Sequence, residues 1–189
     1  MHTRPAGRRF QHLSRSVVVA AVVLATPGWG QAVPVTPDVG TGPNHRPGAP
    51  FRAKLSPPLA EGTVLLVHGR VRDAATGEGI AGSVLDAFQA DHAGHYDMDG
   101  YEYRARVTTD ERGYFELETV VPSNYGPPPH IHLIVTARGY RTTRTEMRFR
   151  DAAHPANDRP ELTPDLVERK RGTKTYLEGA FDVSLRRGD

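Results

Sequence analysis

The sequence contains two histidines separated by one residue, in the segment His130-Ile131-His132. The surrounding run HIHLIVTA is rich in β-branched and aliphatic residues and predicts a strand. Because successive side chains of a strand point to opposite faces, both imidazoles would lie on one face while Ile131 points into the core. Two imidazoles on one face can bind the same metal ion. The pair by itself is also compatible with histidines that face solvent or pack in the core.

Two tyrosines are candidates to complete such a site. Tyr125 precedes His130 by five residues, in the segment PSNYGPPP, whose prolines restrict the backbone. Tyr96 follows the segment ADHAGH, just beyond the end of a predicted strand. Taken singly, each tyrosine is an ordinary surface residue with its hydroxyl in water. The chain has no cysteine, which excludes disulfides, thiolate nucleophiles and cysteine-bound zinc, so a metal would need His, Asp, Glu or Tyr ligands.

The segments that would position these residues resemble short strands joined by tight turns. The chain has 19 glycines and 16 prolines, which favour turns. This pattern predicts an all-β fold, an antiparallel β-sandwich of about seven or eight strands. One short helix is expected at residues 164–170, with Thr163 as N-cap and Pro164 in the first helical position. The expected strands cover residues 63–72, 83–90, 103–109, 114–120, 130–137, 142–149 and 176–185.

Residues 1–32 predict an export signal, so the protein is expected to be periplasmic or secreted. Arginines precede the apolar run SVVVAAVVLA (16–25), which is too short to span a bilayer, and small residues follow near Ala32. An uncleaved membrane anchor is the alternative. The pair Arg8-Arg9 is compatible with the twin-arginine route, but the residues after it fit that pattern poorly, so the Sec and twin-arginine routes both stay open. Residues 33–61 are rich in Pro and Gly and predict an irregular arm, followed by one β-sandwich domain at residues 62–189.

The charge distribution does not favour a nucleic-acid partner. The 24 Lys and Arg residues and 22 Asp and Glu residues give a net charge of +2, and the two signs are interleaved. The densest basic run, Glu168-Arg169-Lys170-Arg171, is expected to be a solvated helix end. No membrane contact is expected beyond the export signal.

A series of short motifs runs in order through residues 69–158: GRVRD (69–73), GIAG (79–82), FQAD (88–91), GHYD (94–97), RAR (104–106), TD (109–110), GYF (113–115), PSNY (122–125) and HIH (130–132). Together they resemble the intradiol ring-cleavage dioxygenases, which include catechol 1,2-dioxygenase and protocatechuate 3,4-dioxygenase. The resemblance implies a β-sandwich and an Fe(III) ion bound by Tyr96, Tyr125, His130 and His132. Phenolates are hard, strongly donating anions that favour ferric iron over zinc, so the ligand types agree with the family.

The resemblance also implies an activity. The protein would cleave the ring of a catechol between its two hydroxylated carbons and incorporate both atoms of O2. Tyr125 would leave the metal and act as the base that takes a substrate proton. The expected partners are a small-molecule or polymer-attached catechol and O2. Because family members often assemble, a homo-oligomer is an open alternative.

The sequence departs from the family just before the first histidine. The segment between Tyr125 and His130 is shorter than in the catechol and protocatechuate enzymes, and Pro127 takes the place of an arginine that lies beside the substrate there. We expect Arg104 or Arg106 to supply this charge as a catalytic residue; the alternative is a salt bridge within the sandwich. The shortened segment, with the export signal, predicts an open pocket and a bulky or polymer-attached catechol.

Two other functions fit parts of the sequence. The frame formed by GRV (69–71), GIAG (79–82) and TDERGYF (109–115) also occurs in transthyretin-like and carboxypeptidase-regulatory-like modules, which bind without catalysis. Such modules have no reason to keep the four ligands. The other alternative is a hydrolase that uses His130 and His132 with another metal, but the sequence has no His-Glu-x-x-His or Gly-x-Ser-x-Gly motif.

Overall fold

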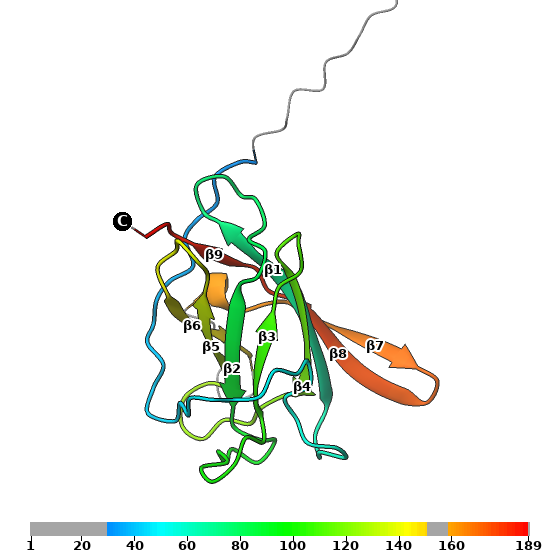
Figure 1. Cartoon of the computed structure of the whole chain (residues 1–189). Helices are drawn as coiled ribbons and strands as arrows, with labels where there is room; N and C mark the ends of the chain where they lie inside the picture. The colour runs from blue at the N-terminus through cyan, green and yellow to red at the C-terminus, as the bar shows by residue number, and fades with distance from the viewer. Residues whose placement is uncertain (1–29, 151–158, 189) are drawn as a thin grey trace, which may run out of the picture.

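The computed structural model describes residues 30–150 and 159–188, and these ranges are almost entirely β-structure and loops (Figure 1). The all-β prediction is therefore confirmed. The predicted export signal falls mostly on residues 1–29, outside the described residues, and stays a prediction. The elements are β1 (Val64–Asp73), β2 (Val84–Gln89), β3 (Arg104–Thr108), β4 (Tyr114–Val120), β5 (His130–Thr136), β6 (Thr143–Arg148), the 3-10 helix η1 (Pro160–Leu162), β7 (Leu166–Arg171), β8 (Lys174–Ala180) and β9 (Val183–Leu185).

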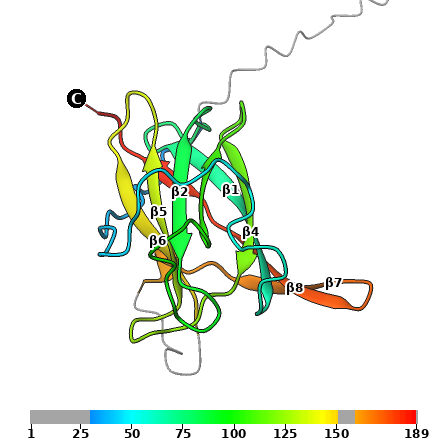
Figure 2. The same ribbon diagram turned by 60° about the horizontal axis from the view of Figure 1, so that its bottom comes forward.

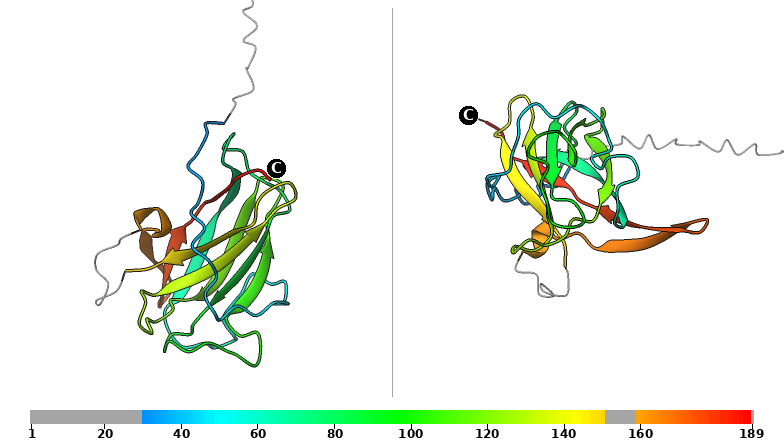
Figure 3. Two further views of the ribbon diagram at one scale, coloured as in Figure 1. Left: turned by 90° about the vertical axis from the view of Figure 1, so that its left-hand side faces the viewer. Right: turned by 90° about the horizontal axis from the view of Figure 1, so that it is seen from below.

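The strands form two sheets packed as a sandwich, as predicted (Figure 3). One sheet has the order β4-β1-β8-β7, with β9 also paired to β1, and the other has the order β3-β2-β5-β6. The second sheet is antiparallel throughout. In the first sheet, β1 pairs in parallel with both β8 and β9, so the sandwich is mixed at this strand.

The strand predicted at residues 176–185 is divided into β8 and β9, which pair with different parts of β1. Between them, the Phe181 N–H donates to the carbonyl of His68 over 2.9 Å. A Cβ atom on Gly69 would lie 1.9 Å from the Phe181 carbonyl oxygen, so the close approach requires glycine.

Side chains that alternate between the two faces of each strand place apolar residues in the core between the sheets. Leu65 and Val67 on β1 face Ile131 and Leu133 on β5 within one apolar cluster, and each is at most 1% exposed. Burial of each such side chain contributes about 1.5–3 kcal/mol. The same alternation turns the two histidines of β5 to the outer face of the four-stranded sheet.

The helix predicted at residues 164–170 is wrong, because these residues lead into and form most of strand β7. Strand β7 pairs with β8 across a two-residue turn that begins at Gly172, which has a φ of 61°. Glycine at the first turn position suits a tight hairpin. Pairing with β8 therefore overrides the helical preference of the run LVERKR, and the basic patch predicted as a helix end lies on an exposed hairpin that projects from the body (Figure 1).

The predicted irregular arm crosses the outer face of the four-stranded sheet from one edge strand to the other (Figure 2). The Val39 N–H donates to the Arg144 carbonyl on β6, and the Arg52 N–H donates to the Arg106 carbonyl on β3. The arm thus forms a wall above the face that carries the histidines. In the described part of the chain, no helix is long and apolar enough to cross a membrane.

Candidate metal centre

One row of side chains crosses the outer face of the four-stranded sheet. The strand register aligns Arg104 with Phe88, Phe88 with His132, and His132 with Glu146. His130 lies on the same face, two residues earlier on β5. The sheet therefore fixes four side chains around His132 by backbone pairing alone.

The two tyrosines reach this face from loops that are closed by backbone hydrogen bonds. Tyr96 lies between Asp91, whose carboxylate accepts from the His95 N–H over 2.9 Å, and Asp97, whose carboxylate accepts from the Gly100 N–H over 2.8 Å. Tyr125 lies in the proline-rich loop between β4 and β5. Asp91 is thus a turn residue, whose carboxylate accepts from backbone N–H groups of its own loop.

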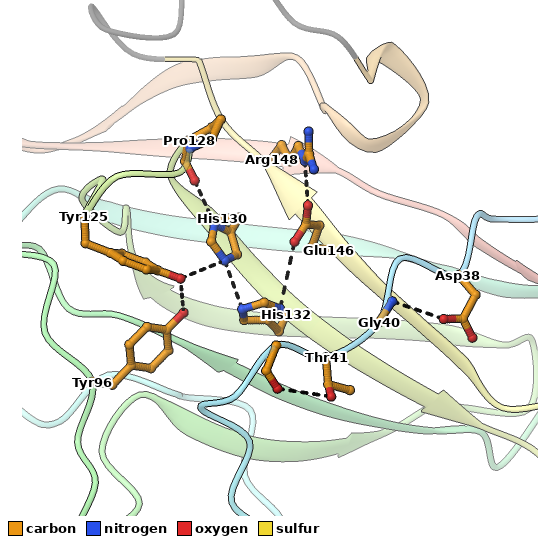
Figure 4. A network of polar contacts seen from close by, with 11 residues as sticks. Asp38, Gly40, Thr41, Tyr96, Tyr125, Pro128, His130, His132, Glu146 and Arg148 are labelled. Carbon is orange, nitrogen blue, oxygen red and sulfur yellow. Dashed lines mark hydrogen bonds and ion pairs between the residues drawn. The ribbon is translucent and has the colours of Figure 1, made fainter.

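The donor atoms of the four predicted ligands converge (Figure 4). The Nε2 atoms of His130 and His132 lie 2.9 Å apart, the Tyr125 hydroxyl lies 3.2 Å from His130 Nε2, and the Tyr96 hydroxyl lies 3.0 Å from that of Tyr125. Ligands that bind one ion at about 2 Å have neighbouring donor atoms at about this separation. The structure therefore brings Tyr96, Tyr125, His130 and His132 together as one candidate site.

The opposite ring nitrogens orient the two imidazoles. Nδ1 of His130 lies 2.7 Å from the carbonyl oxygen of Pro128, which can only accept, so Nδ1 donates and Nε2 presents its lone pair to the shared point. Nδ1 of His132 is buried and has no hydrogen-bond partner among the described residues, and the nearest carboxylate oxygen is Glu146 Oε2 at 3.9 Å. Metal binding by Nε2 would leave Nδ1 protonated, so that Nδ1–H could donate a hydrogen bond to this carboxylate.

Electrostatics favour the neutral forms of His132 and Tyr96. Burial, together with the nearby His130 and Arg104, lowers the pKa of His132 to about 3, so its imidazole is neutral at physiological pH. Burial, reinforced by the hydrogen bond with Tyr125, raises the pKa of Tyr96 against the opposing effect of Arg104. Phenolate at Tyr96 therefore depends on a bound cation to offset this penalty.

The donor set fits a ferric ion. Two phenolates and two imidazoles supply two negative charges and four donor atoms, and hard oxygen anions favour a highly charged ion. Glu146 also forms a group with His130 and His132 in which all donor atoms lie within 4.8 Å of one another. Its carboxylate, however, faces Nδ1 of His132 and not the Nε2 atoms, so it lies behind the ligand.

A cavity of about 430 Å³ opens beside the histidines. The arm lines one side of it through Asp38 to Pro43, and the shortened loop before β5 lines another through Pro127 and Pro128. Tyr125 is 42% exposed and faces this cavity, which makes it the most accessible of the four candidate ligands. The site therefore has one open side next to the ligand that was predicted to act as the base.

The two predicted catalytic arginines have different positions. Arg104 is 1% exposed, donates to the carbonyls of Asp97 and Asn44, and has its guanidinium carbon 6.0 Å from the centre of the Tyr96 ring. Arg106 instead donates to the Ala49 carbonyl in the arm and packs on an exposed phenylalanine. Neither arginine lines the cavity, so Arg104 supports the Tyr96 loop and Arg106 supports the arm.

Glu146 and Arg148 on β6 were not singled out from the sequence, although both line the cavity. A signal for Glu146 was present, because His132 and Glu146 are equally spaced about Gly139 in the predicted hairpin turn, which places them opposite each other. His92 and His95 pair with carboxylates in an exposed loop, and Gln89 is buried between the sheets, away from the cavity.

Known proteins share both the sequence pattern and the fold. A family model described as a dioxygenase matches residues 41–187. This chain belongs to the intradiol ring-cleavage dioxygenase family of oxidoreductases. The intradiol ring-cleavage dioxygenase prcA of Aspergillus niger is 28% identical, with 79% of this chain and 58% of the relative covered. The 6-chlorohydroxyquinol 1,2-dioxygenase of Cupriavidus pinatubonensis is 31% identical, with 70% and 59% covered. The chain thus spans less than two thirds of the length of these curated relatives.

Two solved structures extend the comparison. The dioxygenase domain of a dioxygenase and carbohydrate-binding protein fusion from the cellulolytic bacterium Streptomyces sp. SirexAA-E is 33% identical, with a TM-score of 0.70, and the match covers 82% of this chain and all of that domain. The 3-chlorocatechol 1,2-dioxygenase of Rhodococcus opacus is 26% identical, with a TM-score of 0.72, and the match covers 84% of this chain and 74% of that one.

Proposed function

We propose that the protein is an Fe(III)-dependent intradiol dioxygenase that opens the ring of a catechol between its two hydroxylated carbons with O2. The convergence of two phenol oxygens and two imidazole Nε2 atoms, in which neighbouring donor atoms lie 2.9–3.2 Å apart, carries this proposal. The alternative of a non-catalytic binding module gives no reason for these four donors to meet. Membership of the dioxygenase family supports the same conclusion.

Three of the four proposed ligands would hold the ion, and the fourth, Tyr125, would also take up a proton. His130, His132 and the half-buried Tyr96 are fixed by strands and by a closed loop, so they are suited to hold the ion throughout. Bound Fe(III) would draw electron density from a catecholate and make its ring reactive towards O2. Tyr125 is the accessible ligand, and its Oη is positioned to take a proton from a substrate hydroxyl at the cavity. The substrate supplies the four electrons that O2 requires.

We further propose that the substrate is a catechol on a bulky or polymeric carrier and that the enzyme acts outside the cytoplasm. The cavity is bounded by the arm and by a short proline loop, which leaves room for a substituent that extends into solvent. A similar dioxygenase domain is fused to a carbohydrate-binding protein in a cellulolytic bacterium, which supports a polymeric context. The segment 16–25 supports export.

An oxygen-uptake assay with mass spectrometry of the product tests this function. Catechol and a catechol carrying an extended substituent are offered to the iron-loaded protein under 18O2. The proposal predicts consumption of one O2 per substrate and a diacid that carries both labelled atoms. Turnover of catechol without turnover of any extended catechol would refute the proposed carrier, and no O2 uptake with either substrate would refute the activity.

A further inference from the structure

Glu146 lies opposite His132 in the β5–β6 pairing. The proposed reaction assigns no role to its carboxylate. Its side chain is only 12% exposed, so burial of its negative charge requires a compensating partner. Arg148 supplies one, since its Nε donates to Glu146 Oε1 over 2.6 Å. The other oxygen, Oε2, is directed towards His132 (Figure 4).

The group that Oε2 faces is Nδ1 of His132, which is buried without a hydrogen-bond partner in the described part of the chain. A buried polar atom in this condition is unfavourable, and the 3.9 Å gap is slightly longer than a hydrogen bond. Closing the gap to the usual hydrogen-bond length of about 2.9 Å needs a shift of about 1 Å, through rotation of the carboxylate or the ring.

We propose that Glu146 is a positioning residue whose carboxylate accepts a hydrogen bond from Nδ1–H of His132 and, through its charge, makes Nε2 a stronger donor to the metal. This inference rests on the proposed function and deepens it. The two histidines would then differ, since His130 donates to the neutral carbonyl of Pro128 whereas His132 would donate to a carboxylate. The arginine completes a chain from Arg148 through Glu146 to His132, all on two adjacent strands.

The geometry separates this role from direct metal binding. Nε2 of His132 faces His130 and the tyrosines, and the carboxylate lies on the opposite side of the ring. A carboxylate behind a ligating imidazole fixes its tautomer and orientation and raises its basicity, and removal of such a partner weakens metal binding about 10–100-fold.

The test compares iron-loaded wild-type protein with Glu146→Gln, which keeps the shape and removes the charge. Graded addition of a chelator such as nitrilotriacetate gives the relative affinity for Fe(III). The position of the tyrosinate-to-iron charge-transfer band in the visible spectrum reports how strongly the other ligands donate to the ion. We expect E146Q to bind iron about 10–100-fold more weakly and to shift the tyrosinate-to-iron band to longer wavelength. Glu118→Gln is the matched control, because Glu118 lies on β4 of the other sheet and forms its ion pair with Lys54 in the arm. This variant should bind iron as the wild-type protein does.

Each other outcome is decisive. Wild-type affinity and an unshifted band in E146Q would overturn the positioning role while the metal site stands. Complete loss of iron in E146Q, equal to that in His130→Ala, would make Glu146 a direct ligand and also overturn it. Failure of the wild-type protein itself to bind iron would refute the proposed function. Thermal unfolding of each variant checks that the fold is retained.

Discussion

The imidazole of His132 stacks on the ring of Phe88, with the ring centroids 4.5 Å apart and the ring planes inclined by 17°. The guanidinium carbon of Arg104 lies 5.5 Å from the centre of the Phe88 ring. These three residues come from three adjacent strands of one sheet. The stack fixes the plane of the His132 ring, so the position of Nε2 depends on a buried aromatic residue as well as on its own strand.

Replacement of Phe88 by Ala is expected to lower the free energy of unfolding by about 3–5 kcal/mol, because a fully buried ring is lost and leaves a cavity. His132 would also lose its stacking partner, and iron content should fall. Urea unfolding and metal analysis measure both effects. Phe88→Tyr, which keeps a stacking ring, should retain iron better than the Ala variant; equal iron in wild type and F88A would contradict the role of the stack.

Arg104→Met is expected to cost about 2–3 kcal/mol, because it keeps much of the side-chain volume but removes the charged donor to the carbonyls of Asp97 and Asn44. The loop carrying Tyr96 should loosen, so the iron-tyrosinate absorption should weaken. Arg106→Met is the matched control on the same strand and should leave the absorption unchanged, since the Arg106 side chain donates to the Ala49 carbonyl and packs on Phe51, both in the arm. An equal loss of absorption in both variants would contradict this assignment.

Asp73 gives the fold a pH dependence far from the site. Burial raises the pKa of its carboxyl, but hydrogen bonds from the Ala75 N–H, Tyr140 and Arg187 outweigh this and hold the pKa below its ordinary value. A depressed pKa stabilises the fold above the unfolded value of about 3.9, and this stabilisation disappears as the pH falls through the lower folded value.

We therefore expect Asp73→Asn to lower the free energy of unfolding by about 2 kcal/mol at pH 7. The difference from wild type should shrink below about pH 4, where Asp73 takes up a proton in the unfolded chain but is still ionised in the folded one. Urea unfolding at pH 7 and pH 3 measures this change. A difference that stays the same at both pH values would contradict the proposed role of the ionised carboxylate.

Much of the site was predictable because it rests on strand alternation. The period of two placed His130 and His132 on one face, and the resemblance to the dioxygenase family placed Tyr96 and Tyr125 with them. The helix at 164–170 failed because Leu, Glu, Arg and Lys favour helices locally, whereas pairing with a distant segment decides the outcome in a hairpin. Arg104 and Arg106 lie on the same face of β3, so strand alternation does not distinguish them. The structure shows that Arg104 donates to the Asp97 carbonyl in the Tyr96 loop, whereas Arg106 donates to the Ala49 carbonyl in the arm.

The path of the arm itself could not be predicted, because a Pro/Gly-rich segment carries no periodicity to indicate its direction. Its position depends on backbone hydrogen bonds to both edge strands of the four-stranded sheet. These contacts join residues that lie far apart in the sequence. They determine one wall of the cavity and therefore the shape of the substrate that can enter.

The iron content and visible spectrum of the purified protein, before and after anaerobic addition of catechol, test the central claim most directly. We predict close to one iron per chain, a red-brown tyrosinate-to-Fe(III) band, and a shift to longer wavelength when catechol binds. Tyr96→Phe and Tyr125→Phe should each weaken the band. A colourless protein that takes up no iron would contradict the four-ligand site and the function built on it.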